Sequence, residues 1–368
     1  MAKKKRKSIY ILYLVIIAIA GFIVYGIVIK GDDGSSVAET VAPKEVAENT
    51  SFAKEEPEQV VKEPVKTTLV AGGDIMLSRH VGTKIRQAGD NSLPFRRVVD
   101  MFSKADIAFA NLESPFYDQG PPVTEGMVFK AEPETVDGLK LAGFDMVSLA
   151  NNHFGNQGRS GMKYTYNHLD EHGIEYCGAG MDYDEAHTAS VIEKDGISFA
   201  FLCYNGIPPE SYGADEETAG LAWAQESTDE VVRDVKKAKE TADVVIVSMH
   251  HGTEYTPKPA WEQKAIAHAA IDAGAETVIG HHPHVVQEVE KYNDKLIVYS
   301  LGNLVFDQMW SRETQEGVIG TYQFVDGALE EIAFQAVIIE DYNQPRFASE
   351  SEEVPILKRM GLQSSVLN

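Results

Sequence analysis

Cysteine is nearly absent from this sequence: Cys177 and Cys203 are the only two among 368 residues. So few cysteines exclude a disulfide framework as the basis of the fold. Both cysteines lie in apolar surroundings. We therefore expect buried free thiols, with a single bridge between them as the alternative.

Basic residues are also scarce, with 33 Lys and Arg against 56 Asp and Glu, and the formal net charge is -23. The first 30 residues hold six of the basic residues and no acidic one, so the rest of the chain is more acidic still. Such a body excludes broad binding to nucleic acid or to anionic lipid. A polyanionic substrate would need metal cations or a local basic patch.

Long hydrophobic runs are limited to residues 9–29, which contain no charge and follow a cluster of Lys and Arg. As a helix this run is about 32 Å long, enough for the hydrocarbon core of a bilayer. A cleaved signal peptide would have a shorter apolar region, about 7–15 residues, and a cleavage site. We therefore predict a cytoplasmic basic tail (1–8), a single transmembrane signal anchor (9–29) and an extracellular main domain on the cell membrane.

The remainder divides by composition and pattern. Residues 30–65 are rich in Glu, Ala, Val, Ser, Pro and Lys without a periodic apolar face, which predicts a disordered acidic stalk. In residues 66–341 short apolar strands alternate with amphipathic helices, which is typical of an α/β domain with a largely parallel sheet. A β-hairpin is expected over 318–339, with Asp326-Gly327 at its turn. Residues 342–368 are expected to form a peripheral C-terminal segment.

Polar residues follow the apolar strands at corresponding places. They are Asp74, Glu113, Asn152-His153, His250-His251 and Gly280-His281-His282-Pro283-His284. The carboxyl ends of parallel strands share one edge of a sheet, so these side chains should converge there. A mixed set of oxygen and nitrogen ligands suits Mn²⁺, Zn²⁺ or Fe. Ca²⁺ would prefer oxygen ligands alone, and a thiolate site would need cysteine. Each residue alone also has an ordinary reading, such as a turn for Asp74, a helix cap for Asn152 and a solvated loop carboxylate for Glu113.

Several motifs carry a family resemblance. They are Gly73-Asp74-Ile75-Met76-Leu77, Asn111-Leu112-Glu113, Ala150-Asn151-Asn152-His153, His250-x-Gly252-x-Glu254-Tyr255, Gly280-His281-His282-Pro283-His284-Val285 and Tyr299-Ser300-Leu301-Gly302-Asn303. In this order they resemble the bacterial poly-γ-glutamate capsule synthesis proteins of the CapA/PgsA type, over about residues 67–335. That family is similar to calcineurin-like metallophosphoesterases, which implies a four-layer α/β/β/α sandwich around one or two divalent metal ions.

The resemblance also implies roles for individual residues. The implied metal ligands are Asp74, Glu113, Asn152, His250, His282 and His284. His153 would be the catalytic general acid, and Asn111, His251, His281 and Asn303 would support the ligands. Arg79, Lys130 and Arg312 are the candidate substrate-binding cations. Met76 stands where a metallophosphoesterase carries histidine, and Asn156 and Gln157 replace the family's usual Asp and Tyr, which predicts that one metal position is weak or empty.

Two functions follow from the resemblance. The first is a membrane-anchored, extracellular component of capsule biosynthesis or export. It would contact membrane-embedded synthase or export subunits and poly-γ-glutamate or another cell-surface polymer, and no nucleic acid. The alternative is an active metal-dependent hydrolase at the cell surface that cleaves a phosphoester or an amide. A plain extracellular phosphatase unrelated to capsule is the least favoured reading.

Overall fold

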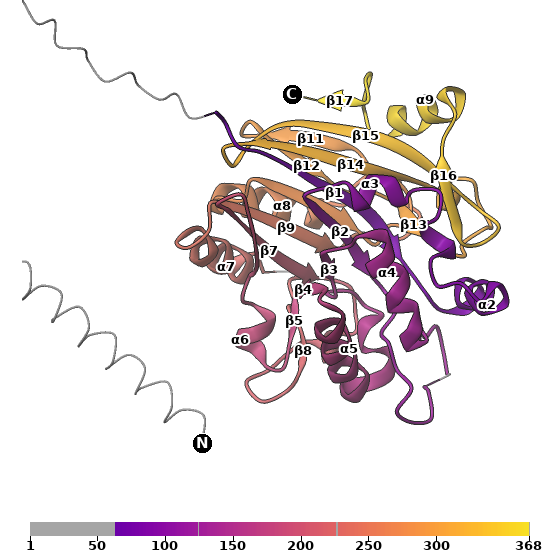
Figure 1. Cartoon of the computed structure of the whole chain (residues 1–368). Coiled ribbons are helices and arrows are strands. Elements are labelled where there is room, and N and C mark those ends of the chain that lie inside the picture. The colour runs from indigo at the N-terminus through magenta and orange to yellow at the C-terminus, as the bar shows by residue number, and fades with distance from the viewer. Residues whose placement is uncertain (1–62, 124, 226, 368) are drawn as a thin grey trace, which may run out of the picture. The chain divides into compact units, whose positions relative to one another are not determined.

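The computed structural model describes residues 63–123, 125–225 and 227–367 (Figure 1). The predicted basic tail, the transmembrane anchor and nearly all of the predicted stalk fall outside these residues. Among the described residues, no helix is both long enough and apolar enough to span a bilayer. The α/β prediction is confirmed, because the described chain forms two large mixed sheets with helices packed against them.

The larger sheet has nine strands, in the order β16-β15-β14-β1-β2-β3-β4, with β13 beside β1 and β17 beside β15. Strands β1 to β4 and β13 are parallel, whereas β14 to β17 join through antiparallel pairs. Their bounds are β1 Lys66–Ile75, β2 Ile107–Leu112, β3 Met146–Ser148, β4 Glu175–Cys177, β13 Asn303–Val305, β14 Glu316–Val325, β15 Ala328–Glu340, β16 Gln344–Phe347 and β17 Val366–Leu367. Strands β14 and β15 form the predicted hairpin around Asp326-Gly327.

The second sheet has six strands in the order β11-β12-β10-β9-β7-β6, parallel except at its two edges. Their bounds are β6 Ser190–Lys194, β7 Ile197–Asn205, β9 Val244–His250, β10 Thr277–His281, β11 Val289–Tyr292 and β12 Lys295–Val298. A small separate ladder pairs β5 (Ala179–Gly180) with β8 (Gly220–Leu221).

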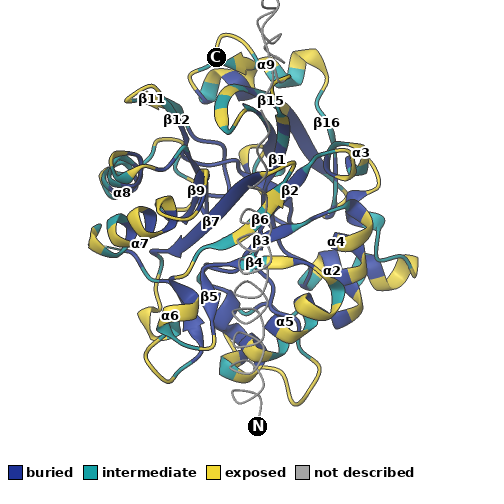
Figure 2. Ribbon diagram, turned by 60° about the vertical axis from the view of Figure 1, so that its left-hand side comes forward, coloured by how far each residue is buried: buried dark blue, intermediate teal, exposed yellow. Residues whose placement is uncertain are grey.

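Helices lie on the outer face of each sheet, and the two sheets share a core. Side chains alternate along the strands, so Leu69 and Ala71 of β1 face the core between the sheets, whereas Val70 faces the helices. Helices α2 (Arg79–Ala88), α3 (Val99–Ser103), α4 (Val136–Ala142) and α5 (Gly158–His172) cover the nine-stranded sheet. Helices α7 (Asp229–Lys239) and α8 (Trp261–Ala273) cover the other sheet. Figure 2 shows the buried strands between helices whose outer faces are exposed.

The remaining helices are short or lie near the C-terminus. They are α6 (Tyr183–Ala186), α9 (Glu350–Arg359) and the 3-10 turns η1 (Leu93–Phe95), η2 (Pro133–Thr135), η3 (Phe154–Gln157), η4 (Glu210–Tyr212) and η5 (Glu313–Gln315).

The described part of the predicted peripheral segment 342–368, residues 342–367, packs into the domain. Strand β16 pairs with β15, and α9 with its C-cap residue buries Ile356, Leu357 and Met360 in the core between the sheets. Ser349 and Glu352 form a capping box that starts α9 and orients its apolar side toward this core. The C-terminal segment is therefore part of the folded domain.

The two cysteines are not free thiols. Cys177 at the end of β4 and Cys203 in β7 form a disulfide, with their Cα atoms 5.4 Å apart. Both side chains point into the core between the sheets, which brings strands from different sheets within bonding distance. The bridge therefore links the nine-stranded sheet to the six-stranded sheet.

Candidate metal centre

The segments that end β1, β2 and β3 meet those that end β9 and β10. Two glycines allow the segment between β12 and β13 to pass close to β1 and β10. A Cβ on Gly73 would lie 2.0 Å from the carbonyl oxygen of Gly302, and one on Gly280 would lie 2.0 Å from that of Tyr299. The backbone N–H of Asp74 donates to Gly302 O at 3.0 Å. The close contact therefore fixes the direction in which β1 presents Asp74.

Asp74, Glu113 and His250 form the first group of potential ligands. All three are buried, and one side-chain ligand atom from each lies within 4.8 Å of the others. Asn111 holds the two carboxylates, since its Nδ2 donates to Asp74 Oδ1 at 2.8 Å and to Glu113 Oε1 at 3.4 Å. Glu113 Oε2 is buried and has no hydrogen-bond partner among the described residues. Asn111 therefore holds one oxygen of the Glu113 carboxylate, and the other oxygen has no hydrogen-bond donor among the described residues.

Glu254, His282 and His284 form a second group with the same spacing. The two groups adjoin, because His282 Nδ1 lies 3.2 Å from His250 Nε2. His282 and His284 have positive φ angles of 95° and 57°, which aim their rings out of the turn that follows β10. Glu254 is not among the ligands expected from the sequence, although it stands in the motif His250-x-Gly252-x-Glu254.

Asn152 completes the contacts around His250. Its Oδ1 lies 3.1 Å from His250 Nε2, the same nitrogen that faces His282. His250 Nδ1 lies 3.2 Å from Asn111 Nδ2. The six implied metal ligands thus lie together in the structure, and five of them belong to the two groups defined by ligand-atom spacing.

Burial sets the electrostatics of this centre. Burial raises the pKa of Glu113 well above its usual value, and the neighbouring Asp74 carboxylate raises it further. Burial also opposes ionisation of Asp74, but its contacts with His281 and His284 hold its pKa well below the usual range. Burial, with His282 nearby, lowers the pKa of His250. Burial opposes protonation of His284, but Glu113 and Asp74 raise its pKa to about 9. The neutral imidazoles of His250 and His282 beside crowded carboxylates form a donor set that a divalent cation would stabilise.

The donor set fits a metal ion on these grounds. Glu113 Oε2 lacks a partner, His250 and His282 face each other through ring nitrogens, and carboxylate, amide and imidazole donors converge. Met76 supplies no ligand, because it is buried in the helix-side core and its sulfur accepts hydrogen bonds from Ser78.

His153 lies beside the centre and is held by two contacts. Its Nδ1 is 3.0 Å from Asn156 Oδ1, and its ring stacks on Phe129 with centroids 3.9 Å apart. Asn156 Oδ1 also accepts the backbone N–H of Phe129, so the His153 Nδ1 must be the donor. Burial lowers the pKa of His153 to about 4. A neutral ring with its hydrogen on Nδ1 can accept a proton at Nε2, whereas the implied general-acid role requires the protonated ring.

The residues expected to support the ligands differ in position. Asn303 Oδ1 lies 2.9 Å from His284 Nδ1, and His281 Nδ1 lies 3.3 Å from Asp74 Oδ1. His251 is buried, but it lines a cavity of about 750 Å³ together with Glu254, Trp261 and His282. This cavity gives access to the centre from the side of the six-stranded sheet.

The three candidate substrate-binding cations lie in two different parts of the structure. Arg79 and Lys130 line two pockets near His153. Arg312 instead forms ion pairs with Glu316 and Glu352 beside α9. Its role as a substrate-binding cation stays a prediction, and two carboxylates on the side of α9 already pair with its guanidinium.

Comparison with known proteins defines the family. The family described as "Bacterial capsule synthesis protein PGA_cap" matches residues 68–308. The chain belongs to this family. The match runs from within β1 to just beyond β13 and includes every residue of the centre.

Relatives include the "Capsule biosynthesis protein CapA" of Bacillus anthracis, 33% identical over 72% of this chain and 66% of that protein. The "PGA biosynthesis protein CapA" of Bacillus subtilis (strain 168) is 32% identical over 67% of this chain and 65% of that protein. The matched region therefore spans just under two thirds of these relatives.

Solved structures with similarity include a "novel phosphatase" of Mycoplasma pneumoniae, at 13% identity and a TM-score of 0.47, covering 76% of this chain and 95% of that one. The calcineurin-like phosphoesterase YfkN of Bacillus subtilis has 12% identity and a TM-score of 0.42, covering 81% of this chain and 97% of that one.

Proposed function

We propose that this capsule synthesis family member is a membrane-anchored, extracellular component of poly-γ-glutamate capsule biosynthesis or export, and that it depends on a divalent metal centre. The observation that carries the metal centre is the buried convergence of Asp74, Glu113 and His250. Membership of the family and the words "PGA biosynthesis" in the name of a relative support the capsule role.

Two features support a location outside the cytoplasm. The Cys177–Cys203 disulfide is of the kind that forms and persists in oxidising compartments. The uncharged run at residues 9–29, with its basic flank on the N-terminal side, has the length and polarity of a signal anchor. Its partners would be membrane-embedded synthase or export subunits and the polymer itself.

One or two ions of Mn, Zn or Fe would occupy the centre. Such an ion polarises a bound oxygen and lowers the pKa of bound water. Asp74 and Glu113 would supply negative charge, and Asn152, His250, His282 and His284 neutral donors. His153 would accept a proton at Nε2, with Asn156 and Phe129 holding its ring.

The alternative is an active metal-dependent hydrolase that acts on a phosphoester or an amide at the cell surface. The cavity of about 750 Å³ that reaches His282 and Glu254 favours this alternative, because a purely structural ion needs no such access. His153, which lies against the centre without being one of its grouped ligands, favours it too.

Complementation tests the proposal. A strain that lacks this gene would receive the wild type, Asp74→Ala or His282→Ala, and surface polymer would be measured. We expect neither variant to restore capsule, since each removes a ligand. Asp100→Ala and His268→Ala, which change a surface acid and a surface histidine, are the matched controls and should restore it. Full rescue by both centre variants would contradict the need for a metal ion and would point to a scaffold role.

A further inference from the structure

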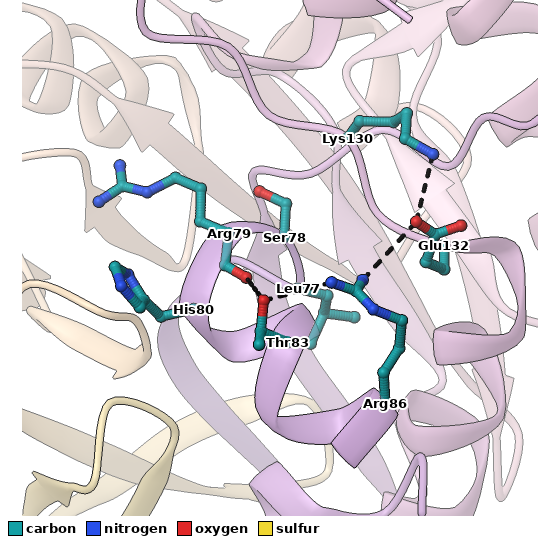
Figure 3. Close-up of a pocket in the computed structure, with 8 residues that line it drawn as sticks. All are labelled: Leu77, Ser78, Arg79, His80, Thr83, Arg86, Lys130 and Glu132. Atoms are coloured by element: carbon teal, nitrogen blue, oxygen red, sulfur yellow. Dashed lines mark hydrogen bonds and ion pairs between the residues drawn. The ribbon is translucent and has the colours of Figure 1, made fainter. Parts of the chain in front are cut away.

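A cleft lined by cations lies beside the candidate metal centre, and we name it the basic cleft. It consists of two pockets of about 370 and 480 Å³ that share Ser78, Arg79 and Lys130. The first pocket is also lined by His80, Thr83, Arg86 and Glu132 (Figure 3). The second is also lined by Pro122, Val123, Gly126, Met127 and Val128. An extended ligand could therefore occupy both pockets at once.

The basic cleft lies close to His153, with the ring of Phe129 between them. The Arg79 guanidinium lies over Phe129, 5.5 Å from the ring centroid, and Phe129 stacks on His153. Two further contacts fix Arg79, since Asp307 forms an ion pair with it at 2.8 Å and Met127 accepts from its Nη1 at 3.3 Å. A group bound in the cleft would therefore be one aromatic ring away from His153.

The charge of the basic cleft is opposite to that of the surrounding protein. Its lining contains three permanent cations, Arg79, Arg86 and Lys130, and one carboxylate, Glu132. The chain as a whole carries a formal charge of -23. An acidic protein repels a polyanion over most of its surface, so a local group of cations is where such a ligand can approach.

Glu132 indicates what the cleft can hold. Figure 3 shows Arg86 and Lys130 reaching this carboxylate from different sides. Arg86 Nη1 and Lys130 Nζ lie 3.7 and 3.4 Å from the same oxygen, Oε1. Charge-assisted hydrogen bonds are usually about 2.7–2.9 Å long, so Glu132 engages both cations only loosely. Their other contacts are with neutral oxygens, Tyr117 O for Lys130 and Thr83 Oγ1 for Arg86, each at 3.2 Å. A second carboxylate could recruit them without breaking a tight ion pair.

We propose that the basic cleft binds carboxylates of an acidic polymer, with Arg86 and Lys130 as the main contacts and Glu132 as a competing internal carboxylate. This inference rests on the proposed function, because it assigns the polymer a place next to the same centre. The ligand class is a polycarboxylate with a flexible backbone, held through its charge. Glu132 lowers the affinity and so allows the polymer to leave.

Polymer binding by the purified full-length protein tests the proposal. Fluorescently labelled poly-γ-glutamate would be titrated in low salt and followed by fluorescence polarisation. The double variant Arg86→Gln/Lys130→Gln should bind about tenfold or more weakly, since it removes two charge-assisted contacts. Glu132→Gln should bind about threefold more tightly, because the competing carboxylate is gone. Opposite changes from neighbouring substitutions are not expected of general damage to the fold.

The matched control is Arg97→Gln/Lys104→Gln, which removes two exposed cations that pair with Glu340 and Asp100. It should leave the dissociation constant unchanged, whereas an equal loss would point to overall charge and overturn the proposal. Wild-type binding by the Arg86/Lys130 variant, or weaker binding by Glu132→Gln, would also overturn it. Polyphosphate is the competing anion, and stronger competition by it at equal charge would assign the cleft to phosphates instead.

The readouts separate this inference from the proposed function. If Asp74→Ala and His282→Ala both restore capsule but the cleft variants change polymer binding as expected, the required metal centre is contradicted and the basic cleft is supported. If capsule depends on Asp74 but the cleft variants bind the polymer as the wild type does, the basic-cleft proposal is wrong and the proposed function is unaffected.

Discussion

The two sheets contribute different chemistry to the centre. The nine-stranded sheet supplies oxygen donors, with Asp74 in β1, Glu113 after β2 and Asn152 after β3. The six-stranded sheet supplies nitrogen donors, with His250 at the end of β9 and two histidines after β10. The group of Asp74, Glu113 and His250 combines both sides, whereas the group of Glu254, His282 and His284 comes from the side of the six-stranded sheet alone. The centre therefore depends on how the sheets are held together.

The two sides are also held differently. On the oxygen side one amide, Asn111, contacts Asp74, Glu113 and also His250 across the boundary. On the nitrogen side the backbone dominates, through the positive φ angles at His282 and His284. Side-chain hydrogen bonds therefore organise the carboxylates, and the conformation of a turn organises the imidazoles. Each of the following tests disturbs one part of this arrangement.

The largest effect should come from separating the sheets at their covalent link. Cys177→Ala/Cys203→Ala opens a bridge with a sequence separation of 26 residues. The entropy of the unfolded chain should then rise, and the free energy of unfolding should fall by about 3–4 kcal/mol. Urea denaturation of the oxidised wild type and of the variant measures this difference.

Reductant provides the control for the disulfide test. Wild-type protein unfolded in reductant should approach the stability of the double variant, whose own transition should not respond to reductant. Equal stability of the oxidised wild type and the variant would mean that packing alone joins the sheets.

The next effect concerns the ligands themselves. Asp74→Ala should weaken metal binding by about 100-fold or more, because Asp74 also receives the N–H of His282 and lies against His281 and His284. His282→Ala removes one nitrogen donor and should weaken binding less. Metal content by mass spectrometry and titration with a competing chelator measure both, with Asp100→Ala and His268→Ala as controls. Full metal content in Asp74→Ala would remove the oxygen side from the centre.

Much of this arrangement follows from local pattern in the sequence. An apolar run of four to seven residues followed by a polar residue fixes where a buried strand ends, so Asp74, Glu113 and His250 can be placed at one edge. The hairpin around Asp326-Gly327 is local in the same way. These features need only the order of neighbouring residues.

Other features depend on contacts between distant segments. Cys177 and Cys203 pair because β4 and β7 face each other across the core, which their local apolar surroundings do not reveal. Glu254 is an exposed loop acid that becomes a candidate ligand only through its distance to His282. Arg312 resembles any exposed cation in the sequence, and its ion pairs with Glu316 and Glu352 depend on where α9 packs.

The smallest effect should come from residues that orient ligands, and it compares the two sides directly. Asn111→Ala removes the amide that contacts three ligands. Asn303→Ala removes an amide that contacts one ligand, His284, with Oδ1 2.9 Å from Nδ1, and that also donates to Gln308 Oε1 and Thr314 O. Each should weaken metal binding by about tenfold or more, with the larger loss for Asn111→Ala. Chelator competition measures both losses, and Asn91→Ala on the surface is the control. A larger loss for Asn303→Ala would reverse the comparison, since the imidazole side would then hold the centre together.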